Sequence, residues 1–298
     1  MNKNTFKNAG FIASIALTVV SMNMSTAVSA KEVCRDRPYK VEIPEGYDHK
    51  RYAPLPMNRL YNAGGYIASI DTDDDDNGDG VKDFMAQPNW VSYQLNAYYR
   101  SEHAGGWKKP ESWYRNTIFD SERHRNKTEK ALDSSYEGIG RIYNRGHLAM
   151  RSDMNRISPQ MGCNSHNFTN AVPQVASFNQ GIWLGLENYI SSLANVKGTV
   201  WVSAGPIFKG KTRYIGDAGE VLIGIPSSLW KTVVWVEDGN LQWRAWIYPN
   251  KAAGAIPNYK TGQCSKDGKY QHQSYLVSNR VNYAAFDSKA IQRRTSVL

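Results

Sequence analysis

The chain has 298 residues, of which 41% are hydrophobic, and its formal net charge is +9 at pH 7. The length suits one sizeable domain, or one domain with an N-terminal extension, and after the first thirty residues no segment is apolar enough to cross a membrane. The positive charge favours a polyanionic partner, but charge alone does not choose among nucleic acid, an anionic glycan and a membrane surface.

The first thirty residues have the pattern of a signal peptide. Lys3 and Lys7 precede an apolar stretch, and Val28-Ser29-Ala30 is the small-x-small pattern that signal peptidase cuts. The alternative is a membrane anchor, but the apolar run at 11–20 is shorter than the roughly 20 residues that a span needs. We therefore expect a secreted or periplasmic protein, with residues 1–30 removed and no membrane anchor afterwards.

Three cysteines follow this segment: Cys34, Cys163 and Cys264. In an oxidising compartment two of them can pair, and their spacing fits no metal-binding pattern. We expect one structural disulfide and one free thiol, and the sequence leaves open which pair forms.

Residues 31–88 have the character of an N-terminal extension. The chain up to about Tyr66 is rich in Pro, Tyr and charge and shows no sustained period, and an acidic run follows at 71–83. Oxygen-bearing residues alternate in this run and Gly80 allows a turn, as in calcium loops, but Ala86 stands where such loops carry a bidentate Glu. We expect an abbreviated structural calcium loop, the alternative being a solvated acidic linker. Its ligands would be Asp75, Asn77, Asp79 and Asp83.

The main domain is expected over 89–298 and contains several strands and one clear helix. Alternation predicts a half-buried strand at 90–95, and further strands are predicted at 139–148 and 200–202. Two apolar runs, 233–236 and 241–246, flank Asp238-Gly239 and predict a hairpin. Residues 179–193 change to helical spacing, with one apolar face formed by Ile182, Leu186, Ile190 and Leu193. These elements predict an α+β fold with a mostly antiparallel central sheet flanked by helices.

Three polar motifs in this domain can together support phosphodiester hydrolysis. They are Asn144-Arg145-Gly146-His147, Thr169-Asn170-Ala171-Val172-Pro173-Gln174, and the stretch from Asn179 to Glu187. The reaction needs a base of near-neutral pKa, a cation and donors that hold the phosphate. His147 at a strand end can be the base, with Gly146 allowing the phosphate backbone to approach. Asn179 offers a neutral oxygen to Mg²⁺, which usually keeps several waters.

Each residue also has a structural alternative. A lone histidine is more often a hydrogen-bonded structural residue. Asn179 can be a helix N-cap, because Asn is favoured there, and Glu187 can be a solvated surface charge. The order and spacing of the motifs favour the functional interpretation.

Taken together, the three motifs resemble the signature of the DNA/RNA non-specific endonucleases, the sugar-non-specific nucleases with a ββα-metal site. The resemblance implies that His147 is the general base, that Asn179 binds Mg²⁺ directly, with Mn²⁺ as the alternative cation, and that Glu187 orders the metal's hydration shell. It also implies that Arg145 contacts phosphate and that Asn170 supports the site.

The family uses a further arginine upstream of the histidine, and Arg115 is the best candidate, with Arg123 and Arg125 as competitors. Two positions depart from the family pattern. Asn144 stands where Asp is usual, which alters the charge beside the motif, and Ser191 stands where some members carry an arginine that serves the transition state.

Basic residues between Arg100 and Arg156 surround these motifs and can form a groove for phosphates, although ordinary solubility explains many lysines. They include Lys108, Lys109 and Arg151. The leading hypothesis is a metal-dependent endonuclease acting on DNA and RNA. The rivals are a catalytically silent extracellular protein that binds nucleic acid or anionic glycan, and a metal-dependent phosphatase acting on small phosphate esters.

Overall fold

The computed structural model describes residues 32–54, 59–71, 86–97, 107–114, 130–217 and 220–252, all within one compact unit that begins at Glu32. Several sequence predictions lie outside these residues and stay predictions. They concern the signal peptide at 1–30, the acidic loop with Asp75, Asn77, Asp79 and Asp83, the arginines Arg115, Arg123 and Arg125, and Cys264. No helix in the described ranges has the length and apolar character needed to cross a membrane.

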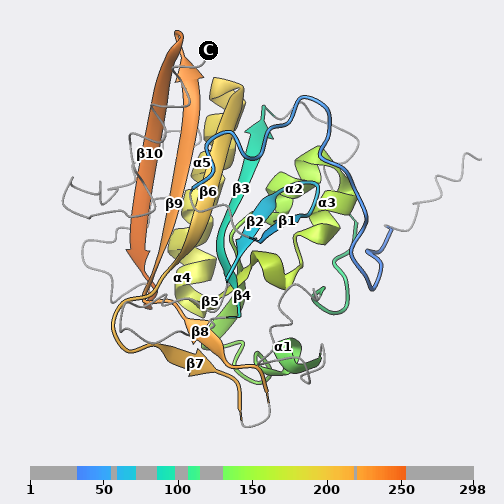
Figure 1. Cartoon of the computed structure of the whole chain (residues 1–298), viewed down its shortest axis with the longest axis vertical. Helices are drawn as coiled ribbons and strands as arrows, with labels where there is room; N and C mark the ends of the chain where they lie inside the picture. The colour runs from blue at the N-terminus through green and yellow to red at the C-terminus, as the bar shows by residue number, and fades with distance from the viewer. Residues whose placement is uncertain are drawn as a thin grey trace, which may run out of the picture. The chain divides into compact units, whose positions relative to one another are not determined.

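The centre of the fold is a six-stranded sheet in the order β1-β2-β3-β6-β9-β10 (Figure 1). Every neighbouring pair is antiparallel, as the sequence predicts. Its strands are β1 (Leu60–Asn62), β2 (Ile67–Ile70), β3 (Pro88–Asn96), β6 (Thr199–Ile207), β9 (Ser228–Glu237) and β10 (Asn240–Pro249).

The predicted hairpin is the β9–β10 pair. Glu237 is opposite Asn240, and the two residues between them, Asp238 and Gly239, have φ angles of 51° and 74°. Such positive φ angles are what a two-residue hairpin turn requires, and Asp and Gly tolerate them best. The local sequence therefore determines this turn and the register of both strands.

The expectation that the strand at 90–95 is half-buried was wrong, because β3 is buried on both faces over most of its length. On one face, Trp90 packs with Trp230 and with apolar residues of the preceding segment, including Ile43. That segment also hydrogen-bonds the strand: Ser92 Oγ donates to the His49 carbonyl at 2.9 Å, and His49 Nδ1 accepts from the Gln94 amide at 2.9 Å. Residues from the N-terminal extension thus cover a face that alternation assigned to solvent.

The N-terminal extension also contributes strands to the sheet, since β1 pairs with β2 and β2 pairs with β3. The expected parts 31–88 and 89–298 therefore share one sheet. The extension is further tied to the helices by a disulfide between Cys34 and Cys163, which settles the pairing that the sequence left open.

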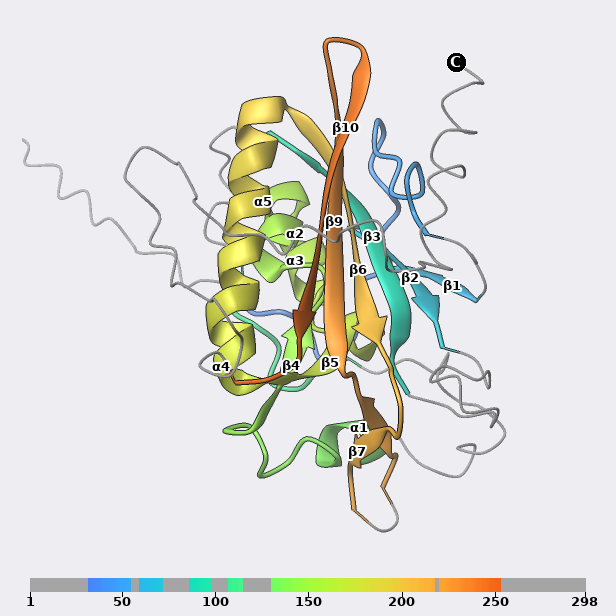
Figure 2. The same ribbon diagram turned by 90° about the vertical axis from the view of Figure 1, so that its left-hand side faces the viewer.

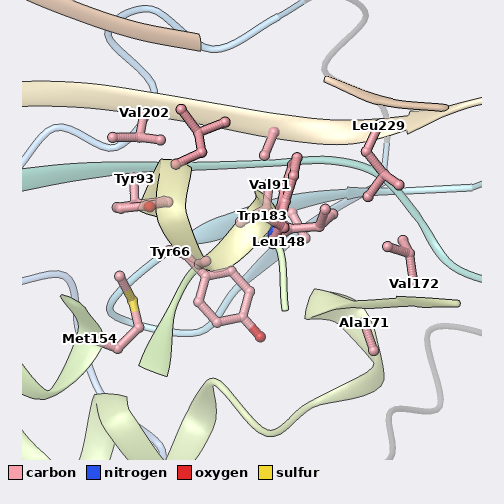
Figure 3. Close-up of a cluster of buried hydrophobic side chains, with 14 of the residues drawn as sticks. Tyr66, Val91, Tyr93, Leu148, Met154, Ala171, Val172, Trp183, Val202 and Leu229 are labelled. Atoms are coloured by element: carbon pink, nitrogen blue, oxygen red, sulfur yellow. The ribbon is translucent and has the colours of Figure 1, made fainter. Parts of the chain in front are cut away.

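Helices cover one face of the sheet, with α5 running along β3, β6 and β9 (Figure 2). The helical elements are α1 (Lys130–Ser134), α2 (Arg151–Ile157), α3 (Pro159–Asn164), a 3₁₀ turn η2 (Phe168–Asn170), α4 (Ala176–Phe178), a π turn η3 (Asn179–Trp183) and α5 (Leu184–Lys197). The core lies between sheet and helices. Figure 3 shows Val91, Tyr93, Val202 and Leu229 from the sheet meeting Leu148, Met154 and Trp183.

Two short antiparallel pairs lie outside the main sheet. One joins β4 (Tyr143–His147) to β5 (Ala171–Val175), and the other joins β7 (Arg213–Ile215) to β8 (Ile223–Ile225). The strand predicted over 139–148 is thus shorter than expected, because residues 138–142 form turns. The β4–β5 pair carries two of the three polar motifs.

Candidate active site

The three motifs form a hairpin followed by a helix. Strand β4 ends at His147 and pairs with β5, and the chain then enters α4, η3 and α5 without a break. Ile182 and Leu186 are fully buried and Ile190 is almost so, which confirms the predicted apolar face. A Cβ at Gly146 would lie 2.2 Å from Cδ of the buried Gln174, so a side chain at this position would require Gln174 to move. The phosphate approach expected at Gly146 stays a prediction.

His147 is held between aromatic neighbours at the end of β4. Its ring lies 4.7 Å from that of Trp113 and 5.0 Å from that of His166, between ring centroids. Its Nε2 is enclosed and has no hydrogen-bond partner among the described residues, unlike that of a hydrogen-bonded structural histidine. Burial, assisted by the nearby His166, Arg151 and Lys231, lowers the pKa of His147 well below its usual value. The imidazole is therefore neutral at pH 7, the form that a general base requires.

The backbone that follows His147, at Leu148 and Ala149, is fixed by Asn170, which is fully buried. The Leu148 amide donates to the Asn170 carbonyl at 3.0 Å, and the Ala149 amide donates to Asn170 Oδ1 at 2.7 Å. Asn170 Nδ2 donates in return to the Ala149 carbonyl at 2.9 Å. These bonds hold His147 in place without bringing the Asn170 side chain to the reacting groups.

Asn179 is oriented by Asn144 from the neighbouring strand. Asn179 Nδ2 donates to Asn144 Oδ1 at 3.0 Å, and Gln180 Nε2 donates to the same oxygen at 3.0 Å. Asn179 Oδ1 accepts no hydrogen bond from any described residue. The N-cap alternative was wrong, because the helical segment begins at Ala176 and Asn179 has helical φ and ψ angles. With its amide nitrogen engaged, Asn179 keeps its side-chain oxygen available to accept from, or bind to, another group.

The departure from Asp to Asn at position 144 is accommodated by this geometry. Asn144 Oδ1 accepts hydrogen bonds from the side-chain amides of both Asn179 and Gln180. The carboxylate of an Asp at this position would offer the same acceptor oxygen. Asn144 Nδ2 is used separately, as a donor to the Gly140 carbonyl at 2.8 Å. The substitution therefore removes a charge beside the site while keeping the contact that orients Asn179.

Glu187 is only 6% exposed, so the alternative of a solvated surface charge was wrong. Its Oε1 lies 3.2 Å from Nζ of Lys231, which is fully buried on β9. Burial raises the pKa of Glu187 to about 7, against the opposing effect of the Lys231 ammonium. The carboxylate is thus held beside a cation within the protein rather than free at the surface.

The sequence interpretation missed Lys231. It is the lone charged residue in the otherwise apolar or hydroxyl-bearing run at 229–236, a pattern that can indicate a buried charge with a specific partner. Its Nζ also donates to the Leu148 carbonyl at 2.9 Å and lies 4.5 Å from the ring centroid of Trp183. Lys231 therefore connects Glu187 to the backbone beside His147.

Ser191 is part of a second buried polar group. Its Oγ donates to Asp153, and Arg156 from α2 donates to the Ser191 carbonyl at 3.3 Å. Arg156 Nη1 lies 3.8 Å from Asp153 Oδ1, and burial raises the pKa of Asp153. The side chain of Arg156 is thus used inside the fold and does not belong to a basic groove.

Arg145 lies two residues before His147 in sequence and forms an ion pair in the structure. Its Nη2 lies 2.8 Å from Asp133 Oδ1, and its guanidinium is 5.2 Å from the ring centroid of Tyr136. Nε of Arg145 has no hydrogen-bond partner among the described residues. A phosphate contact by Arg145 would therefore be made in competition with Asp133.

The hairpin and helix that carry the three motifs lie within a segment that matches a known family. Residues 82–285 match the DNA/RNA non-specific endonucleases. This chain belongs to the DNA/RNA non-specific endonuclease family. The family membership that the three motifs indicated is thereby confirmed.

Relatives in this family share part of the chain. Mitochondrial endonuclease G of Bos taurus is 29% identical over 137 residues, which are 43% of this chain and 45% of the relative. The human mitochondrial nuclease EXOG is 30% identical over 149 residues, 46% of this chain and 40% of the relative. The chain thus spans less than half the length of these curated relatives.

A solved structure shows the same fold. A chain from the crystal structure of an EndoG/EndoGI complex superposes with a TM-score of 0.52 at 21% sequence identity, covering 68% of this chain and 78% of that chain. The α+β fold expected for this family is confirmed by this similarity.

These relatives correct one prediction. The N-terminal pattern led us to expect a secreted or periplasmic protein, whereas the endonuclease G and EXOG relatives are mitochondrial nucleases. The expected location is contradicted by this comparison. The charge and hydropathy pattern of an N-terminal segment is only weak evidence for a particular cellular location, because signals for different compartments share basic and apolar residues.

The side chains of the site suit a hard cation that keeps much of its water. The described residues contain no cluster of three or more His, Cys, Asp or Glu that could enclose a metal ion. The oxygen donors that the helical segment carries are the oriented amide of Asn179 and the carboxylate of Glu187, which is paired with Lys231. Mg²⁺ favours such oxygen donors and is commonly held by one or two protein ligands. The donor set therefore fits Mg²⁺ better than a metal that needs several imidazole or thiolate ligands.

Proposed function

We propose that this protein hydrolyses internal phosphodiester bonds of DNA and RNA without strong sequence preference. The observation that carries the proposal is the double link between β4 and η3. Asn179 bonds to Asn144 near the start of β4, and Trp183 Nε1 donates to the His147 carbonyl at 3.0 Å at its end. A neutral imidazole and an oriented amide oxygen are thus fixed on adjacent elements.

In this proposal the neutral imidazole of His147 takes a proton from the attacking water. Asn179 Oδ1 would hold Mg²⁺, or Mn²⁺ in its place, and Glu187 would order its hydration shell. When bound, the cation supplies neutralising charge for the phosphate and the leaving oxygen. Arg145 and Arg115 contact the phosphate, and Asn144 and Asn170 support the base and the ligand. The activity is assigned to residues 89–298, completed by the strands β1 and β2.

The test is digestion of supercoiled plasmid and ribosomal RNA by the purified chain in Mg²⁺. We expect both substrates to be degraded, with loss in EDTA and a decrease of about 100-fold or more for His147→Ala, the usual contribution of a positioned base. His147→Asn is the matched control, because it keeps a planar polar side chain that cannot act as a base.

Two other results would overturn the proposal. Intact plasmid and RNA with retained, salt-sensitive binding would indicate a silent binding protein. Release of phosphate from mononucleotides without plasmid cleavage would indicate a phosphatase. Both assays use the same protein preparation. A thermal melt of the parent and of each variant verifies that all of them are folded.

A further inference from the structure

A basic pocket lies on the N-terminal segment, apart from the residues assigned to chemistry. It has a volume of about 510 Å³, and three cationic residues line it: Arg35, Arg37 and Lys40. Tyr39 and Gln160 are also in its lining, and no described acidic residue is. Three like charges around one hollow repel one another, so the pocket is suited to an anion.

The cations form no ion pair within the described part of the chain. Arg37 and Lys40 are exposed and form no ion pair there. The guanidinium of Arg35 lies 4.7 Å from the ring centroid of Tyr39 and likewise forms no ion pair with a described carboxylate. An anionic ligand would therefore meet charged donors that need not first release a partner.

The backbone of this pocket is fixed at several points. Cys34 is joined to Cys163 by the disulfide, and its amide donates to the Lys108 carbonyl at 2.9 Å. The Tyr39 amide donates to Asn164 Oδ1 at 2.8 Å, and Asn164 Nδ2 donates to the Tyr39 carbonyl at 2.9 Å. Because the main chain is ordered beforehand, binding an anion here costs little additional backbone entropy.

Two chains of contacts connect the pocket with His147. The Tyr39 ring lies 5.6 Å from that of Trp107, whose carbonyl accepts a hydrogen bond from Arg151. Along the other route, Tyr114 donates from its hydroxyl to the Arg35 carbonyl at 2.9 Å, and its amide donates to the carbonyl of His166, whose ring packs against His147. Basic and aromatic side chains thus extend from the pocket toward the candidate site.

We propose that this pocket binds backbone phosphates of the nucleic-acid strand whose scissile bond lies at His147. The inference rests on the proposed function, since it assigns a second contact to the same substrate. Arg37 and Lys40 contact phosphate oxygens, while Tyr39, with Arg35 over its ring, forms part of the wall of the pocket. Such contacts add affinity and no sequence preference, in keeping with a non-specific substrate.

The experiment measures binding of a labelled DNA duplex to the full chain carrying His147→Ala, in EDTA, over a series of salt concentrations. Removing one phosphate contact makes the slope of log affinity against log salt shallower by about 0.9 for duplex DNA. We expect Arg37→Gln/Lys40→Gln to weaken binding and to reduce the slope by about 1 to 2. The exposed positions of both residues leave the fold intact, which a thermal melt verifies.

The control is Lys197→Gln/Arg244→Gln, which removes two positive charges from outside the pocket, one at the end of α5 and one on the edge strand β10. We expect its slope to equal that of the parent. An equal change in both variants, or no change in either, would overturn the pocket, since general charge and not local binding would then govern affinity.

The outcome is separable from that of the proposed function. Plasmid digestion by the unsubstituted chain in Mg²⁺ is measured in parallel: digestion with an unaltered slope for Arg37→Gln/Lys40→Gln rejects the pocket alone. Absence of both digestion and binding rejects both proposals. In the active background, the double variant should raise KM for long DNA at unchanged kcat, because a remote phosphate contact binds ground state and transition state alike.

Discussion

Asn144 and Asn179 hold one side of the candidate site through neutral amide groups near the surface, whereas Glu187 and Lys231 hold the other side through opposite charges inside the core. A neutral hydrogen bond contributes about 1 kcal/mol net. Breaking a buried ion pair by removing one partner costs about 3–5 kcal/mol, because the other charge is left without compensation. Substitutions at Asn144 or Asn179 should therefore have little effect on folding. Substitution of Glu187 or Lys231 should also lower the stability of the fold, because Lys231 lies in the central sheet.

The largest expected effect comes from Lys231→Met. The substitution leaves the Glu187 carboxylate buried without its cation and removes the donor to the Leu148 carbonyl. We expect the free energy of unfolding at pH 8 to fall by about 3–5 kcal/mol, as measured by chemical denaturation.

The control is the double variant Lys231→Met/Glu187→Met. Replacing a whole buried pair by apolar residues is often neutral, so most of the lost stability should return. If the loss of stability in the double variant equals the sum of the losses in the two single variants, Glu187 and Lys231 do not act as a pair. The contrast between the amide pair and the buried ion pair would then be wrong.

His166 gives a pH-dependent test of the buried side. Burial, together with the charge of Arg151, lowers the pKa of His166 to about 4 from 6.5. Above pH 6.5 the ring is neutral in both folded and unfolded chains. As the pH falls from 6.5 to about 4, the unfolded chain binds a proton that the folded chain does not, so stability is lost.

The loss attributable to His166 is about 3 kcal/mol by pH 4. Chemical denaturation of the parent and of His166→Gln at pH 7 and pH 4 measures it. The parent should lose more stability than the variant over this interval. Equal losses in the two proteins would show that His166 is not held neutral by burial.

Asn144→Ala tests the amide side. It removes the oxygen that accepts from Asn179 and Gln180, so the Asn179 amide is free to rotate. Loss of a group that orients a metal ligand typically costs at least tenfold in metal affinity. We expect about tenfold weaker Mn²⁺ binding, or about 1.4 kcal/mol, measured calorimetrically in the His147→Ala background. Asn144→Asp keeps the acceptor and should bind Mn²⁺ at least as well; equal weakening by both substitutions would contradict the orienting role.

The smallest effect is expected at the ion pair of Arg145 and Asp133, whose side chains keep 29% and 23% of their exposure. Partly exposed pairs contribute about 0–1 kcal/mol because water screens the charges. Asp133→Asn should therefore lower the free energy of unfolding by less than about 1 kcal/mol in the same denaturation assay. A loss approaching that of Lys231→Met would erase the distinction between surface and buried charge.

Much of the fold followed from local pattern. The Asp238-Gly239 turn, the strands around it and the apolar face of α5 were all predicted from neighbouring residues, because turn angles and side-chain periodicity are local properties. The burial of β3 on both faces was not predicted, since the covering residues come from the distant segment around His49. An alternating pattern indicates which side chains share a face but not what covers each face.

The candidate site divides in the same way. Order and spacing of the motifs indicated the family to which the chain belongs, and made His147, Asn179 and Glu187 the candidates for its chemistry. Spacing could not reveal that Lys231 pairs with Glu187, or that His166 packs on His147, because these partners approach through the fold from separate elements. For the same reason Arg145 was expected to be available for phosphate, and its pairing with Asp133 emerged only from the structure.

The sequence by itself determined the antiparallel α+β architecture, the hairpin and helix that carry the motifs, and the residue types available for chemistry. The tertiary structure decided the Cys34–Cys163 pairing, the burial that lowers the pKa of His147, and the pairing of Glu187 with Lys231. Local patterns record backbone preference and amphipathicity, which act over a few residues. Burial and charge pairing depend on distances between segments remote in the chain, and only the packed sheet and helices fix those distances.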